Sequence, residues 1–331
     1  MNLTPHSVAL TRNKQMIAEI TAWVVAVAVY VFFPQYLSLA TAIVIAALFA
    51  LSCDLVIGFA GILTLGQALY FGLGAYTAGL IAKYGWTEAI TGAVTSSLIS
   101  AGAAAIIGPF VLRLSGLSLM MVTLGLSVIV FEAANKLTGI TGGDDGLAEF
   151  SMAPLFGYFR WSILGYTKYL YSLAWLVIVY YALRAIVSSA FGVSLQGIRE
   201  NRVRMELLGT PILRRLVLAY IIAGGVAGLA GALSAQTNVF VGLGVLSIET
   251  TLDGIVIVVL GGIGTLSGSL LGAPVYLLIK DVAQQWNPHI WMFAVGALLI
   301  FVLRLCPYGL IGMYRAVFEG ATRAVKRVFF R

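Results

Sequence analysis

The apolar runs of this chain are too long and too numerous for a water-soluble fold. Of its 331 residues, 60% are hydrophobic and only 10% are charged, and the mean hydropathy is +1.00. An ordinary soluble domain is roughly one quarter charged, and a chain of this size cannot bury so much apolar surface inside its own core. No stretch of domain length has ordinary charge density. The sequence therefore predicts a single transmembrane domain over residues 1–331, surrounded by lipid.

The apolar runs predict where the chain crosses the membrane. A bilayer core about 30 Å thick needs roughly 20 apolar residues per helix. Candidate runs lie at 17–33, 39–57, 60–82, 89–112, 116–134, 169–187 and 215–235. A glycine-broken stretch at 252–264 and 266–284 follows, and then a run at 290–306. We predict an all-α polytopic membrane protein with about ten transmembrane helices, or eight if the broken stretch holds a re-entrant element.

Basic residues gather in three places and predict the orientation. They precede the first run, crowd the loop after the sixth run, and make up the tail at 307–331. Lysine and arginine are retained on the cytoplasmic side of a membrane. We therefore predict that both termini, the basic tail and the loop are cytoplasmic. This parity requires an even number of crossings within 252–284.

The loop at 192–209 predicts a short amphipathic helix between two spans. Four apolar residues recur at spacings that place them on one helical face: Leu195, Ile198, Met205 and Leu208. Glu200 with Arg204, and Arg202 with Glu206, are opposite charges four residues apart, which supports a helix. Such a helix could lie on anionic lipid or dock on a partner protein. The mixed charge favours the partner.

The sequence gives little support for phosphate binding, metal binding or catalysis by this chain. The glycine-rich run at 261–268 lacks the lysine of a phosphate-binding loop, so ATP-driven transport would need an ATPase on another chain. His6 and His289 are the only histidines, which argues against a metal site. Cys53 and Cys306 lie in apolar segments and are interpreted as small core residues. We predict no catalytic site, no metal, no bound cofactor and no nucleic-acid partner.

Several motifs resemble one known family. The run GIRENRVRMELLGTP, Gly197–Pro211, is similar to the coupling-loop motif of permeases in ATP-binding-cassette (ABC) importers of the LivM-like branched-chain amino acid family. Four further blocks resemble that family in the same order, at 55–80, 115–147, 227–233 and 258–273. Each glycine pattern alone is weak, but their order and spacing make the resemblance specific.

The resemblance implies a permease subunit of an ABC importer in a bacterial inner membrane. Its implied partners are a second, homologous permease chain, two cytoplasmic ATPases that use ATP and Mg, and a periplasmic or tethered solute-binding protein. The coupling helix at 192–209 would contact an ATPase through residues of the motif: Ile198, Arg199, Glu200, Asn201, Arg202, Arg204, Glu206 and Gly209.

The implied solute is a branched-chain or related amino acid. Gln67 stands where the family commonly has histidine, Asp54 where asparagine is usual, and Ser269 where proline is common. The triplet Arg199–Asn201 favours amino acids over urea. The alternatives are a permease for urea, short amides or another small polar solute, and a stand-alone secondary transporter. The latter would need ionisable groups at span centres, which are nearly absent.

Polar residues within the apolar runs are candidates for the translocation path because intramembrane polarity is expensive. Gln67 and Tyr70 either line the path or belong to a closely packed glycine-rich segment. Asp253 either caps its helix or faces the path, and Gly262 lies at the break. Asp54 is expected to be a solvated boundary residue.

The acidic loop Thr141–Gly146 is predicted to lie on the outer side. Asp144 and Asp145 are candidates for contact with a binding protein, and the alternative is a solvated turn.

Overall fold

The computed structural model describes residues 34–148, 150–154, 161 and 165–286, with isolated positions at 23, 26, 27, 29, 30, 32, 296 and 310. This part of the chain is all-helical and contains no strand, as predicted. The predicted spans at 17–33 and 290–306, the tail at 307–331, and His6, His289 and Cys306 fall outside the described residues, apart from those isolated positions.

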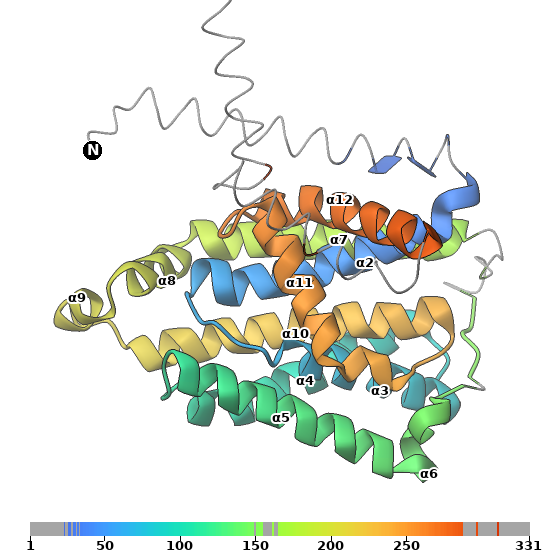
Figure 1. The fold of residues 1–331 in the computed structure, drawn as a ribbon, viewed down its shortest axis with the longest axis horizontal. Helices are drawn as coiled ribbons and strands as arrows, with labels where there is room; N and C mark the ends of the chain where they lie inside the picture. The colour runs from blue at the N-terminus through green and yellow to red at the C-terminus, as the bar shows by residue number, and fades with distance from the viewer. Residues whose placement is uncertain are drawn as a thin grey trace, which may run out of the picture.

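Most of the chain forms long helices that run side by side (Figure 1). The long helices are α2 (Leu37–Cys53), α4 (Ala89–Val111), α5 (Leu117–Lys136), α7 (Tyr166–Ser188), α10 (Ile212–Asn238) and α12 (Leu266–Trp286). The shorter ones are α3 (Gln67–Lys83), α6 (Thr138–Thr141), α8 (Ala190–Glu200), α9 (Arg202–Leu207) and α11 (Ile248–Gly261). Single turns or tight segments are η1 (Pro34–Tyr36), the π-helix η2 (Asp54–Phe59), η3 (Gly143–Asp145) and η4 (Leu243–Leu246).

Within the residues that the structure describes, six helical segments are long and apolar enough to cross a membrane. They are Pro34–Phe59, Ala89–Val111, Leu117–Lys136, Tyr166–Ser188, Ile212–Asn238 and Leu266–Gln285. They confirm the runs predicted at 39–57, 89–112, 116–134, 169–187, 215–235 and 266–284. The chain is therefore a multi-pass membrane protein.

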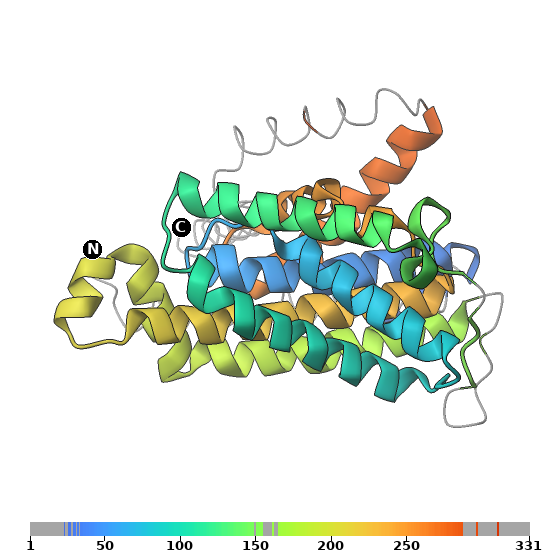
Figure 2. The same ribbon diagram turned by 90° about the horizontal axis from the view of Figure 1, so that it is seen from below.

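The two ends of the bundle differ. Helices α8 and α9 project beyond the long helices at one end, and α6 with η3 lies at the other (Figures 1 and 2). We call these the α8 end and the α6 end. Helix α2 runs toward the α8 end, and α10 runs from the α8 end to the α6 end.

The prediction of one helix over 60–82 is wrong at its start. Residues 60–66 are not helical, and α3 begins only at Gln67. Gly61 has φ +67°, a left-handed conformation that ends the preceding helix and that favours glycine. The chain thus re-enters the bundle as irregular backbone before α3 forms.

The glycine-broken stretch is broken where the sequence predicted, but its first helix differs from 252–264. Helix α11 spans 14 residues, which is a rise of about 21 Å and less than a bilayer core. It begins beside the start of α3, because Ala68 N–H donates to Thr251 Oγ1 at 2.9 Å. Gly262 and Gly264 then take φ +118° and +78°, and α12 starts at Leu266.

The helix predicted over 192–209 is in fact two helices. Asn201 is extended, with φ −156° and ψ 101°, and separates α8 from α9. Its side-chain Oδ1 accepts a hydrogen bond from Arg204 N–H at 2.9 Å and caps α9. The break removes the helical spacing between Glu200 and Arg204, and no ion pair joins these two described residues.

Helix α10 lies at the centre of the bundle, against α2, α3 and α4. Small residues bring its backbone against that of α3: a Cβ atom on Gly74 would collide with the backbone of Gly228. Across the same seam, the rings of Tyr70 and Tyr220 meet edge to face at 5.4 Å. Close approach through glycines is the usual way that membrane helices associate.

We expect Gly262→Leu to destabilise the protein. A leucine at φ +118° stores strain of about 1–3 kcal/mol. The matched control is Gly102→Leu in α4, where an added Cβ meets no atom within 4 Å and helix propensity improves. Thermal stability of the purified variants, measured by size-exclusion chromatography after heating, separates the two. Equal stability of both variants would contradict a required left-handed glycine at the break.

Candidate functional site

A polar cavity of about 410 Å³ lies between α2, α7, α10, α11 and α12. We call it the Asp253 cavity. Its volume falls within the range of small-molecule sites, about 300–1,000 Å³. Nine of its lining residues have polar side chains: Gln35, Ser38, Thr41, Lys168, Ser234, Thr237, Asn238, Thr250 and Asp253. The described part of the chain therefore has a chamber with many polar wall residues inside the helix bundle.

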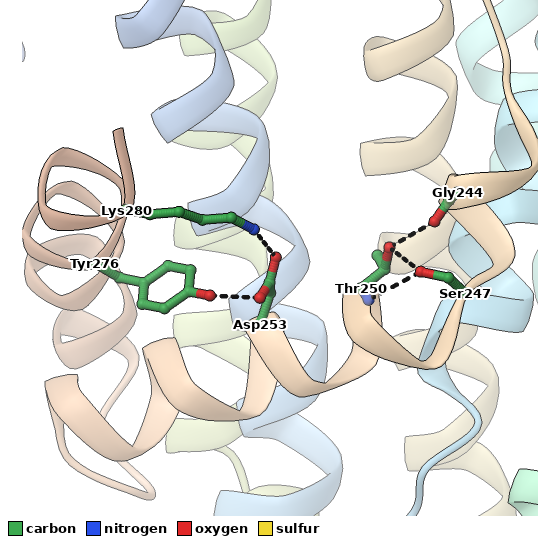
Figure 3. A network of polar contacts seen from close by, with 6 residues as sticks. All are labelled: Gly244, Ser247, Thr250, Asp253, Tyr276 and Lys280. Carbon is green, nitrogen blue, oxygen red and sulfur yellow. Dashed lines mark hydrogen bonds and ion pairs between the residues drawn. The ribbon is translucent and has the colours of Figure 1, made fainter. Parts of the chain in front are cut away.

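Asp253 lines this cavity and joins α11 to α12 (Figure 3). Its Oδ2 accepts from Lys280 Nζ at 2.5 Å, and its Oδ1 accepts a hydrogen bond from the hydroxyl of Tyr276. The Lys280 and Asp253 side chains are 18% and 30% exposed. Two roles were considered for Asp253, helix capping and facing the path. In the structure it lines the cavity, and Ser247 is the N-cap of α11. The ion pair also spans the glycine break.

The start of α11 is fixed by a separate set of hydrogen bonds (Figure 3). Ser247 is the N-cap, and its Oγ accepts from Thr250 N–H at 3.4 Å. The Thr250 hydroxyl donates to Gly244 O at 2.9 Å. Capping at Ser247 leaves the Asp253 carboxylate, two turns later, available to α12.

Gln67 and Tyr70 are buried and do not line the Asp253 cavity. Gln67 begins α3, and its Nε2 reaches Ser52 O at 3.5 Å. Tyr70 packs against Tyr220, and its carbonyl accepts from Ser100 Oγ at 3.2 Å. Of the four path candidates, Asp253 lines the cavity and Gly262 lies at the nearby break, whereas these two lie in helix–helix contacts.

A second polar cluster lies at the α8 end. Arg199 of α8 donates from Nη1 to Gly58 O, at the end of η2. In the same place, Asp54 Oδ1 accepts from Gly264 N–H at 2.7 Å. The expectation that Asp54 is solvated is wrong, since it is fully buried. Helix α8, the π-helix η2 and the glycine break thus meet around one carboxylate and one guanidinium.

The remaining residues of the coupling motif divide into a buried face and an exposed face. Leu195 and Ile198 are fully buried against the bundle. From Glu200 to Gly209, the exposed residues of this remainder are Glu200, Asn201, Val203, Arg204, Glu206, Leu207, Leu208 and Gly209. Arg202 is partly buried. The amphipathic character predicted for this segment is present in α8, where Leu195 and Ile198 are buried. Beyond the bend at Asn201 it is not kept, because Met205 is only partly buried and Leu208 is exposed.

Asp144 and Asp145 form the exposed tip of η3 at the α6 end. The loop that follows is tied back to the segment after α10 by paired backbone bonds, Leu147 N–H to Val241 O at 2.8 Å and Val241 N–H to Leu147 O at 3.0 Å. The acidic tip is therefore presented on a fixed base.

Sequence analysis did not single out Lys168, Tyr276 or Lys280. Lys280 interrupts the apolar run at 266–284 and Lys168 borders the run at 169–187, which is a signal that could have identified both. Their pairing partners depend on tertiary structure. Cys53 is buried, as predicted. In the described residues, no group of three or more His, Cys, Asp or Glu side chains could hold a metal ion.

A multi-pass helical bundle with a polar chamber, broken helices and a protruding amphipathic segment defines a membrane transport component. The family of branched-chain amino acid transport system permease components matches residues 35–303. The chain belongs to this family, and the resemblance read from its motifs is confirmed. It is therefore a transport component and not a catalyst.

The chain is similar to characterised relatives over most of its length. It is 28% identical over 298 residues to the high-affinity branched-chain amino acid transport system permease protein LivM of Salmonella typhimurium, covering 84% of this chain and 70% of that protein. The same figures hold for LivM of Escherichia coli. A probable LivM of Methanocaldococcus jannaschii is 24% identical over 306 residues, which is 79% of this chain and 89% of that protein. No solved structure matches the chain.

The Asp253–Lys280 pair generates a stability prediction. Lys280→Met removes the cation and leaves the carboxylate under-partnered, which we expect to destabilise the protein by about 1–3 kcal/mol. Adding Asp253→Asn should restore most of this loss, because the remaining group is neutral. Asp281→Asn, next to Lys280 but bonded to Gln285 at the surface, is the control and should change little. Denaturation midpoints provide the measurement. A double variant no more stable than Lys280→Met would be inconsistent with a compensating pair.

Proposed function

We propose that this chain is one of two permease subunits of an importer for branched-chain or related amino acids, and that it receives the solute from a binding protein. The family match over 35–303 carries this proposal, and the names of the LivM relatives support the solute class. ATP and Mg would be used by two partner ATPases, and a second, homologous permease chain would complete the pathway.

The proposed orientation has the α8 end in the cytoplasm of a bacterial cell and both termini on that side. With the predicted spans at 17–33 and 290–306 added to the six long spans and to α3, the short α11 makes the tenth crossing. Residues 239–261 return toward the α8 end, and only 14 of them form a helix, the short α11. This count satisfies the even number that the basic loop requires.

The segment α8–α9 is proposed as the docking element for a partner ATPase. It projects beyond the bundle (Figure 1), is held to it by the buried Leu195 and Ile198, and exposes charges of both signs. Mixed charge suits a protein surface. The bend at Asn201 presents α9 at an angle to α8, so the docking surface has two parts.

Arg199 is proposed as the residue that passes movement of α8 to the transmembrane part. Its guanidinium donates to Gly58 O, and Gly58 lies beside Gly264, whose N–H bonds to Asp54. A shift of α8 therefore acts on the end of η2 and on the glycine break together. The break is the boundary between α11 and α12, and these two helices line the Asp253 cavity.

Uptake of radiolabelled L-leucine tests the proposed function. The chain would be expressed with its ATPase, second permease and binding protein in cells that lack their own branched-chain importers. We expect uptake that depends on ATP and that excess isoleucine or valine inhibits. Inhibition by urea or acetamide, with none by these amino acids, would instead support the permease for small amides.

Docking and coupling are separable by mutation. Glu200→Lys with Arg202→Glu should prevent co-purification of the ATPase. Arg199→Gln should leave co-purification intact but lower leucine uptake by about tenfold, the effect of losing one charge-assisted hydrogen bond. The control is Arg113→Gln, an exposed arginine just after α4 at the same end, which should transport normally. Normal uptake in Arg199→Gln would refute the coupling role.

A further inference from the structure

We infer that the Asp253 cavity is a binding site for a zwitterionic α-amino acid with an apolar side chain. This inference rests on the proposed function and adds to it a place within this chain where the solute is held. Three independent features of the cavity support it: the charges on its walls, the helix ends that border it, and its apolar floor.

The first feature is a cation and an anion on separate walls. Lys168 comes from the first turn of α7 and Asp253 from α11. Lys168 makes no ion pair with any residue that the structure describes. A carboxylate has about four acceptor sites, and Lys280 and Tyr276 occupy one on each oxygen of Asp253. The cavity therefore offers a free cation to a carboxylate and spare acceptor sites to an ammonium.

The second feature is the direction of the bordering helices. Gly165 and Lys168 belong to the start of α7, where the helix dipole is positive. Ser234, Thr237 and Asn238 belong to the last turns of α10, where the dipole is negative. Each helix end has the polarity that reinforces one charge of a zwitterion. The two ends meet the cavity from different helices, so the positive and negative sides are separated.

The third feature is the apolar floor of the cavity. Six lining residues with apolar side chains make it up, of which Ile45, Phe49, Phe71 and Ile257 are buried and Ala46 and Leu277 are partly buried. An aliphatic side chain would be removed from water here at a gain of about 25 cal/mol per Å². A neutral solute such as urea would leave Lys168 without a counter-ion and the floor without a partner.

The position of the cavity fits a solute that enters from the α6 end. Its α2 residues run from Ser38, at the α6 end of that helix, to Phe49, its α7 residue Lys168 lies in the first turn of α7, and its three α10 residues lie within the last five positions of α10. It extends inward to Phe71 and Gly254, beside the broken starts of α3 and α11. Paired broken helices commonly border the substrate site of transporters. In the proposed orientation, the opening faces the binding protein.

Solute protection of an introduced cysteine tests occupancy directly. Ser38 lines the cavity and is exposed, so Ser38→Cys in a Cys306→Ser background should react with a membrane-impermeant methanethiosulfonate. The assembled transporter is labelled, without binding protein, in the presence of increasing concentrations of L-leucine. We expect millimolar leucine to slow labelling, whereas leucinamide, 4-methylpentanoate and urea, which each lack one or both charges of the zwitterion, should not.

Charge-removing variants then assign the two walls. In the Ser38→Cys background, Lys168→Gln and Asp253→Asn should each raise the half-protecting leucine concentration roughly tenfold, the loss of one charged hydrogen bond. The controls are Lys83→Gln and Glu249→Gln, two exposed residues that do not line the cavity. Ser151→Cys, on the exposed loop at the same end, should be labelled at one rate with or without leucine.

The failure of this inference is distinguishable from failure of the proposed function. Leucine uptake by the wild-type transporter, with no protection of Ser38→Cys, would overturn the site and leave the importer intact. Protection unchanged by Lys168→Gln and Asp253→Asn would overturn it equally. Absence of leucine uptake by the wild type would refute the proposed function, and with it the amino acid as the ligand.

Discussion

In a bilayer every backbone N–H and C=O must find its partner inside the protein, because lipid offers none. Long helices meet this requirement unaided, but the irregular stretches of this chain do not. Their N–H groups bond to buried side chains, Leu65 to Thr123 at 3.1 Å and Gly264 to Asp54 at 2.7 Å, and an N–H in the first turn of α3 does the same, Ala68 to Thr251 at 2.9 Å. The broken helices are thus possible only because hydroxyl and carboxylate groups lie opposite each break. The arrangement of the central bundle follows from this requirement.

The same requirement places polarity where transport needs it. A polar chamber in the bundle exists beside the points at which α3 and α11 begin, and its carboxylate, Asp253, is anchored by α12. At the other end, the carboxylate that satisfies Gly264 lies next to the guanidinium that bonds Gly58. The residues that stabilise irregular backbone and the residues proposed to act in translocation are therefore neighbours, and the glycine break lies between them.

Sequence patterns predicted the elements whose formation is local. Apolar runs of bilayer length gave six spans, and the glycines at 261–268 indicated the break. The break before Gln67 was missed because residues 60–66 are as apolar as a helix. The irregular backbone there depends on the left-handed Gly61 and on the bond of Leu65 to Thr123, 58 positions away. The interruption at Asn201 was missed because regular charge spacing suggested continuity, whereas the asparagine side chain competes for the local backbone. Asp253 was identified by its charge, but its partners Tyr276 and Lys280 are known only once α11 folds against α12.

The contact between Gly74 and Gly228 has a mechanical consequence. With no side chains between them, α3 and α10 cannot slide without backbone collision, and α4 packs along the same pair. These three helices are therefore expected to move as one rigid unit. On the opposite wall, α11 and α12 also meet backbone to backbone, at Gly261 and Gly268, and Asp253 bonds to both Tyr276 and Lys280. Any rocking that opens and closes the chamber must therefore move α11 and α12 together, as a second unit.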